Sequence, residues 1–123
     1  MDEKIALLID DDKDLTGFVG MAIETLGYTV KTAHTGAVAL QRLAEMVPDL
    51  VILDMHLPDM LGVDILQRIR QDERLRHVPV AVLSGGTQPL SWNLHEHANL
   101  VLTKPIDAGT LTRLIDRISA SGQ

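Results

Sequence analysis

Cysteine is absent from this sequence of 123 residues, so neither a disulfide framework nor a thiolate metal site can form. Aromatic residues are almost as scarce, since one Trp, one Tyr and one Phe are present, too few to stack on a flavin ring. The longest unbroken apolar run, 5–9, is far too short to span a bilayer, and no signal-peptide pattern follows Met1. These absences predict a cytoplasmic protein that has no membrane contact.

Basic residues are in the minority, because 11 Lys and Arg stand against 17 Asp and Glu and give a net charge of −6. A surface of this sign repels phosphate backbones, so no direct contact with nucleic acid is expected. The composition, 46% hydrophobic and 23% charged, is that of a soluble globule. A length of 123 residues corresponds to one domain, so we expect 1–123 to fold as a single unit that acts through another molecule.

Short apolar runs, typical of strands that are buried on both faces, alternate with helical stripes. The expected strands are 5–9, 28–33, 50–53, 78–83 and 100–102. Gly27 is expected to end the first helix, while Thr35 and Asp107 are expected to cap later ones. One short helix is expected within 84–98, and 119–123 reads as a tail. The apolar residues of the helical stripes are Leu15, Phe18, Val19, Ala22, Ile23 and Leu26; Val38, Leu43 and Ala44; Leu61, Ile65, Leu66 and Ile69; and Leu111, Leu114, Ile115 and Ile118.

This alternation predicts an α/β protein with a doubly wound parallel sheet. Right-handed crossovers leave few topologies for five βα units, and the flavodoxin-like (βα)5 arrangement with strand order 2-1-3-4-5 is favoured. In such sheets, ligands bind beyond the carboxyl ends of the strands, near the switch in strand order. A functional site is therefore expected at that edge.

Polar side chains follow four of the expected strands. Asp10 and Asp11 come after the first, Asp54 after the third, Ser84 after the fourth and Lys104 after the fifth. Clustered carboxylates need a cation, and hard oxygen ligands suit Mg²⁺. A lysine and a hydroxyl beside such a metal favour phosphoryl transfer, with Asp54 as the nucleophile and with Ser84 and Lys104 holding phosphoryl oxygens.

In their order along the chain, these residues resemble the receiver domains of response regulators from two-component systems. The matching segments are Ile9-Asp10-Asp11, Asp54-Met55-His56-Leu57-Pro58 followed by Gly62, then Ser84, and Lys104-Pro105.

The resemblance implies that Asp54 is the phosphoacceptor and that Asp11 binds Mg²⁺ directly. It also implies that Asp10 acts through metal-bound water and that the backbone carbonyl of His56 is a further ligand. Ser84 matches the hydroxyl residue that responds to phosphorylation in this family. Lys104 matches the lysine of the family's active site, and the peptide bond before Pro105 is expected to be cis.

The resemblance further implies a phosphohistidine donor on a sensor histidine kinase or a histidine phosphotransfer domain, and a downstream protein partner. The chain is then a phosphorelay signalling protein that catalyses phosphotransfer and dephosphorylation only on itself, and it is not an enzyme for another substrate. A phosphorylation-dependent homodimer stays open.

Several positions depart from the family pattern. Val101 stands three residues before Lys104, where the family usually has an aromatic residue, and the interval from Ser84 to Lys104 is 104 − 84 = 20 residues, about two shorter than expected for the family. These departures support an alternative, a pseudo-receiver that binds partners without being switched by phosphate. His56 and Gly86 stand where the family's side chains flank the hydrolytic water, so we predict that His56 affects the lifetime of the phosphoryl group.

Other constellations have simpler interpretations. Asp12, Asp14 and Asp59 are expected to be solvated loop residues or helix caps, because a single acid at a strand end is usually one or the other. Asp12-Lys13-Asp14-Leu15-Thr16 also fits the D-x-D-x-T pattern of haloacid-dehalogenase-type phosphatases, but no acid pair follows late in the chain. His95 and His97, two positions apart, do not share a helical face as zinc ligands would.

Overall fold

The structure, a computed structural model, describes residues 3–85 and 94–121. The prediction that concerns Gly86 lies outside the described residues. Strands and helices alternate as expected, in the order β1 (Lys4–Ile9), α1 (Lys13–Glu24), β2 (Tyr28–Ala33), α2 (Gly36–Glu45), β3 (Leu50–Asp54), α3 (Gly62–Gln71), β4 (Val80–Ser84), α4 (Leu94–His97), β5 (Leu100–Thr103) and α5 (Ala108–Ser121).

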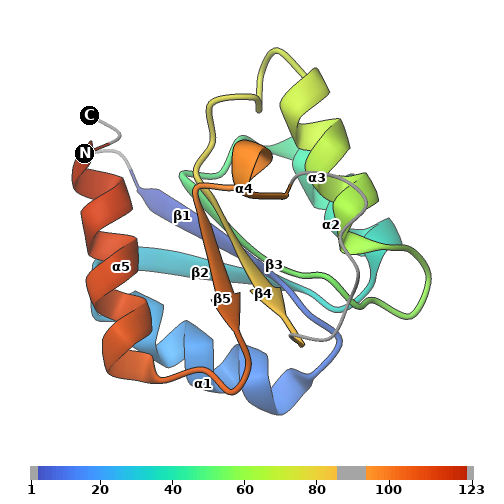
Figure 1. Cartoon of the computed structure of the whole chain (residues 1–123). Coiled ribbons are helices and arrows are strands. Elements are labelled where there is room, and N and C mark those ends of the chain that lie inside the picture. Colours follow the sequence, from blue (N-terminus) through green and yellow to red (C-terminus); the bar gives the residue numbers. More distant parts are fainter. Residues whose placement is uncertain (1–2, 86–93, 122–123) are drawn as a thin grey trace.

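The strands form one parallel sheet in the order β2-β1-β3-β4-β5, which confirms the predicted doubly wound topology (Figure 1). Ile9, at the end of β1, pairs with Ala33 of β2 on one side and with Leu53 of β3 on the other. The carboxyl ends of β1 and β3 are therefore level, so the residues that follow them meet at one edge of the sheet.

Helices cover both faces of the sheet. In Figure 1, α1 and α5 lie on one face, and α2, α3 and α4 lie on the other. β1, β3 and β4 are apolar because both of their faces are buried, and each face contributes to its own core. The core beneath α1 and α5 includes Leu8, Val19, Ile23, Leu111 and Ile115. The core beneath α2 and α3 includes Leu7, Leu43, Leu53, Ile65 and Ile69.

The predicted helix ends are confirmed by their hydrogen bonds. The Thr35 hydroxyl accepts from the backbone N–H of Val38 at 3.1 Å, and the Asp107 carboxylate accepts from the N–H of Thr110 at 2.8 Å. Gly27, just after α1, has φ +94°, a left-handed conformation that favours glycine.

Some sequence expectations were wrong in detail. Phe18 and Leu61 were assigned to the apolar stripes of helices, but they are 49% and 57% exposed. α1 buries only the narrower strip that faces the sheet, and Leu61 is the residue that precedes α3 rather than a part of its buried face. α5 continues through Ser121, so the expected tail at 119–123 is helical for most of its length. β4 begins at Val80 rather than at Val78.

Among the helices that the structure describes, none combines the length and the apolar character that crossing a membrane requires.

Candidate functional site

Three carboxylates meet at the carboxyl ends of β1 and β3. One oxygen each from Asp10, Asp11 and Asp54 lies within 4.8 Å of the other two. Asp10 and Asp54 are both only 3% exposed, whereas Asp11 is open to solvent. Two buried carboxylates so close together repel each other and lose hydration, and a bound cation would compensate for both effects. The oxygen donor set and the open side at Asp11 fit Mg²⁺, which keeps several of its waters.

Lys104 brings a positive charge to the same point from the end of β5. Its Nζ lies 3.2 Å from Oδ1 of Asp54 and 3.4 Å from Oδ2 of Asp10. The backbone N–H of Lys104 donates to the carbonyl of Ser84 at 2.8 Å, so the lysine is held beside the end of β4. The peptide bond between Lys104 and Pro105 is cis, as predicted. The ammonium therefore bridges the two buried carboxylates.

Burial and neighbouring charges have opposing effects on the pKa values of this cluster. Burial raises the pKa of Asp10, and the charge of Asp54 raises it further, while the N–H of Asp12 and the charge of Lys104 act in the opposite direction. For Lys104, burial alone would lower the pKa, but the charges of Asp10 and Asp54 outweigh it and the pKa is raised. The lysine thus stays protonated. Ionisation of Asp10 still costs free energy unless a further positive charge binds beside it.

Ser84 completes the edge of the sheet from β4. It is 7% exposed and is aligned with Thr103 of β5, while Asp54 is aligned with Leu83. Ser84 thus stands one residue beyond the strand position that faces Asp54. The parallel register places this hydroxyl residue between the strand ends that carry the carboxylate and the lysine.

The loop after Asp54 turns back tightly towards α3. The N–H of Gly62 donates to the carbonyl of Met55 at 3.0 Å, and His56 faces Leu61 across an isolated antiparallel bridge. A Cβ on Gly62 would lie 2.5 Å from the carbonyl oxygen of Asp54, so only glycine fits without a shift of the backbone. The His56 side chain is exposed.

Two residues that were not assigned to the site from the sequence make hydrogen bonds in the segments that follow β2 and β3. The first is His34, whose Nδ1 lies 2.9 Å from the carbonyl oxygen of Asp10, to which it donates. The parallel pairing of Ile9 with Ala33 is the signal that could have placed His34 there.

The second is Asp59, in the loop between β3 and α3. Its carboxylate accepts from the N–H groups of Gly36 and Ala37, at 2.7 and 2.9 Å, at the start of α2. These two bonds lower the pKa of Asp59. Asp59 is therefore a helix cap, which was one of the two roles expected for it. The helix that it caps is α2, although the helix that follows it in the chain is α3. Asp12 caps its own helix, since its carboxylate accepts from the N–H of Leu15 at 3.0 Å.

Comparison with known proteins identifies the family. A profile described as "Response regulator receiver domain" matches residues 6–116. The DNA-binding dual master transcriptional regulator RpaA of Synechocystis sp. is 36% identical over 82% of this chain and 43% of its own length, so the chain spans less than half of that relative. Chemotaxis protein CheY-3 of Vibrio cholerae is 30% identical over 91% of this chain and 88% of its own.

A solved structure supports the same assignment. The signal receiver domain of a putative LuxO repressor protein from Vibrio parahaemolyticus superposes with a TM-score of 0.87 at 28% identity, covering 98% of this chain and 93% of that one. The profile match, the two relatives and the strand order agree, and the chain belongs to the response regulator receiver domain family.

Proposed function

We propose that this chain is a phosphorylation-dependent switch, in which Asp54 accepts a phosphoryl group with the help of Mg²⁺. The observation that carries the proposal is the position of the Lys104 ammonium, 3.2 Å from Asp54 and 3.4 Å from Asp10, within a cluster of three carboxylates. A structural ion pair would need one carboxylate, whereas phosphoryl transfer needs a nucleophile, a metal site and a separate cation together.

In the proposed reaction an oxygen of the Asp54 carboxylate attacks the phosphorus of a phosphohistidine. The new P–O bond forms as the P–N bond to the imidazole breaks, and the histidine leaves. Lys104 and the Ser84 hydroxyl donate hydrogen bonds to phosphoryl oxygens, whose negative charge is spread over three positions in the transition state. Attack of water on the phosphorus later releases inorganic phosphate and restores the carboxylate.

The residues that would hold Mg²⁺ are Asp11 and Asp54 directly, Asp10 through water, and the His56 backbone carbonyl. When bound, Mg²⁺ would reduce the repulsion between the anionic nucleophile and the anionic donor. The costly ionisation of Asp10 supports this assignment, because a divalent cation offsets its burial and its repulsion by Asp54.

The proposed donor is a sensor histidine kinase or a histidine phosphotransfer domain, and the proposed target is a protein partner in the cytoplasm. We propose that residues 1–123 act as one receiver domain that contacts neither nucleic acid nor membrane itself, and that any homodimer depends on phosphorylation.

Intact-mass measurement after incubation with acetyl phosphate and Mg²⁺ tests the proposal. The wild-type protein should gain the mass of one phosphoryl group, and chelation of Mg²⁺ should prevent the gain. Asp54→Ala should gain nothing, while Asp64→Ala, a matched change at an exposed aspartate of α3, should gain as much as the wild type. Equal labelling of the Asp54→Ala protein would overturn the assignment of the phosphoacceptor.

A pseudo-receiver is the second candidate, and Val101 favours it. Val101 is half-buried against the core beneath α2 and α3, where the family usually has an aromatic side chain that moves with the switch. Beryllofluoride with Mg²⁺ separates the two candidates. A switch should change its Trp92 fluorescence or its molecular mass on binding, whereas site occupancy without either change would favour the pseudo-receiver.

His56 is proposed to set the lifetime of the phosphoryl group, because its exposed side chain stands two residues after Asp54. The His56→Ala protein should incorporate phosphoryl groups as the wild type does but should lose them at a different rate, followed by intact mass after removal of the donor. Identical rates of loss would contradict this role.

A further inference from the structure

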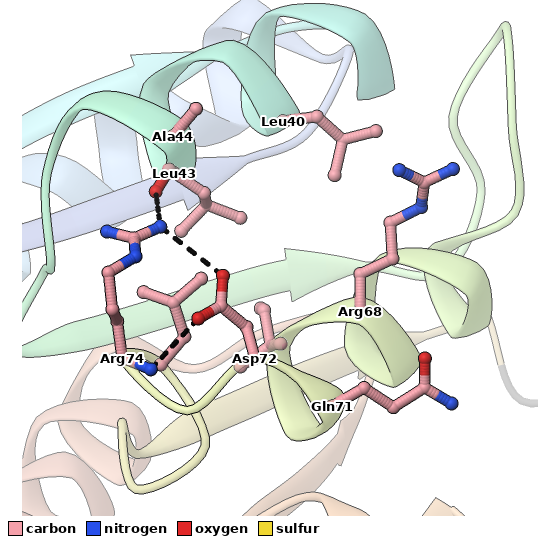
Figure 2. A pocket seen from close by; sticks show the side chains of 9 residues that line it. Leu40, Leu43, Ala44, Arg68, Gln71, Asp72 and Arg74 are labelled. Atoms are coloured by element: carbon pink, nitrogen blue, oxygen red, sulfur yellow. Dashed lines mark hydrogen bonds and ion pairs between the residues drawn. The ribbon is translucent and has the colours of Figure 1, made fainter.

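A second concave surface lies between α2 and the end of α3, away from the carboxylate cluster. Because α2 and α3 run back from the carboxyl ends of their strands, their last turns lie towards the opposite edge of the sheet. The groove between these turns has a volume of about 390 Å³, within the range of binding pockets. Figure 2 shows the lining, which includes Leu40, Leu43, Ala44, Arg68, Asp72 and Arg74.

The floor of this groove is apolar and firmly held. Leu43, Ile69 and Leu75 are at most 3% exposed and belong to the core beneath α2 and α3, and the half-buried Leu40 packs against that core. The part of this apolar floor that is open to a ligand is therefore formed by Leu40 and by the exposed Ala44 of α2. The buried side chains beneath hold these two in place, so an apolar side chain would bind there with little loss of conformational entropy in the groove itself.

Two arginines border the groove on opposite sides in Figure 2. Nη2 of Arg74 donates to the carbonyl of Leu43 at 2.9 Å and lies 3.3 Å from Oδ2 of Asp72, so this guanidinium is fixed. Arg68 is exposed, and no hydrogen bond or ion pair joins its guanidinium to another residue in the described ranges 3–85 and 94–121. One border is rigid, and the other is available to a ligand.

The segment that borders the groove is positively charged, whereas the chain as a whole is negatively charged. Residues 68–76 hold four arginines and two acids, Asp72 and Glu73, so this segment has a net charge of 4 − 2 = +2 in a protein whose net charge is −6. Arg70 is used internally, because it donates to the carbonyls of Val78 and His97 at 2.8 and 2.6 Å. Arg74 faces the groove but is paired with Asp72, so Arg68 is the arginine of the lining whose guanidinium is open to a ligand. Guanidinium groups match carboxylates better than ammonium groups do, since they donate two parallel hydrogen bonds.

We propose that this groove binds an acidic segment of a partner protein, with an apolar side chain of that segment on Leu40 and Ala44 and a carboxylate on Arg68. Charge complementarity selects this occupant, because the acidic surface elsewhere repels it and the arginine border attracts it. An amphipathic helix placed in a groove makes this combination of contacts. The surface shares no residue with the phosphorylation site, so the inference does not depend on the proposed function.

Fluorescence anisotropy with a labelled peptide tests the proposal. The probe is a short peptide of glutamates with two leucines four positions apart, capped at both ends, and it should bind the full chain saturably. Arg68→Glu should weaken this binding about tenfold or more, because a charge at an interface is reversed. Arg117→Glu, the same change at an exposed arginine of α5 on the other face of the sheet, should leave the affinity unchanged.

Two further measurements test the apolar floor and the independence of the groove from the carboxylate cluster. A peptide in which both leucines are replaced by serine should bind at least about tenfold more weakly if the apolar floor takes part. Asp54→Ala should bind the probe as the wild type does, so that failure of the phosphorylation proposal does not affect the result. Absence of saturable binding, equal loss in the Arg68→Glu and Arg117→Glu proteins, or equal binding of the serine peptide would each overturn the inference.

Discussion

The carboxylate cluster at the ends of β1 and β3 and the groove between α2 and α3 carry charge of opposite sign, and the fold treats them differently. At the cluster, two carboxylates are buried side by side and share one lysine. At the groove, both arginines are exposed, and only Arg74 is fixed, by a backbone carbonyl and by Asp72. Like charges are buried close together in the carboxylate cluster, whereas the charges of the groove are open to solvent. Only the cluster therefore needs a bound cation to reduce its repulsion.

The largest expected effect tests the role of the lysine in the cluster. Lys104→Gln removes the cation from Asp54, and the rate of labelling by acetyl phosphate should fall by about 100-fold, the usual cost of losing one charge-stabilising donor. The time course of intact mass with Mg²⁺ measures it. Lys31→Gln, at an exposed lysine of β2, is the control and should react at the wild-type rate.

The next largest effect, on stability, is expected where the backbone of Gly62 lies close to that of Asp54. Gly62→Ala places a Cβ 2.5 Å from the Asp54 carbonyl oxygen, and should lower the free energy of unfolding by about 2 kcal/mol through overpacking. Gly17→Ala is the control, because the added Cβ in α1 meets nothing within 4 Å. It should raise stability by about 0.5–1 kcal/mol, since alanine is the better helix former. Urea denaturation measures both, and equal effects would contradict the close contact.

A smaller effect is expected at the groove. Arg74→Gln removes the hydrogen bond to Leu43 and the ion pair with Asp72. It should lower the free energy of unfolding by about 0.5–1 kcal/mol, a small amount because the Arg74 side chain is 47% exposed. Arg117→Gln should change the unfolding free energy by less than about 0.5 kcal/mol, as surface substitutions usually do. Indistinguishable denaturation curves for the two variants would show that Arg74 does not hold the groove together.

The last and smallest effect is on the pH dependence of stability. Because its pKa in the folded state is raised above 3.8, Asp10 binds its proton more tightly when folded. Its contribution therefore favours folding at low pH and is lost as the pH rises from 3.8 through the folded pKa. Asp10→Asn without Mg²⁺ should then be more stable than the wild type at neutral pH, with the difference shrinking in acid.

Mg²⁺ provides the matching control for the Asp10→Asn protein. It should stabilise the wild type more than this variant, because a ligand that binds the folded state adds more stability the higher its affinity. A variant less stable than the wild type at neutral pH without Mg²⁺ would contradict the repulsion in the cluster.

Local sequence signals predicted the ends of the five strands to within two residues. The bounds of β2 agree with the prediction, and Thr35 and Asp107 cap helices as expected, because a cap involves residues only three positions apart. Strand ends were also predictable, and in a parallel sheet they brought Asp10, Asp54 and Lys104 together.

Contacts between distant segments were not predictable in the same way. Phe18 fits a helical stripe, but whether a stripe residue is buried depends on the width of the surface beneath the helix, and Phe18 is 49% exposed. Asp59 was expected to be a loop residue or a cap, and the start of α2, which it caps, lies more than twenty residues earlier in the chain.

The sequence by itself determined the alternation of elements, the strand order and the polar residues at the strand ends, because periodicity, capping and right-handed crossovers act locally or through one rule of topology. Only the tertiary structure decided that Lys104 bridges two buried carboxylates, that Asp59 holds α2, and that Arg74 reaches Leu43 across 31 positions to form the groove. These contacts depend on side-chain distances between packed elements, which residue spacing along the chain does not specify.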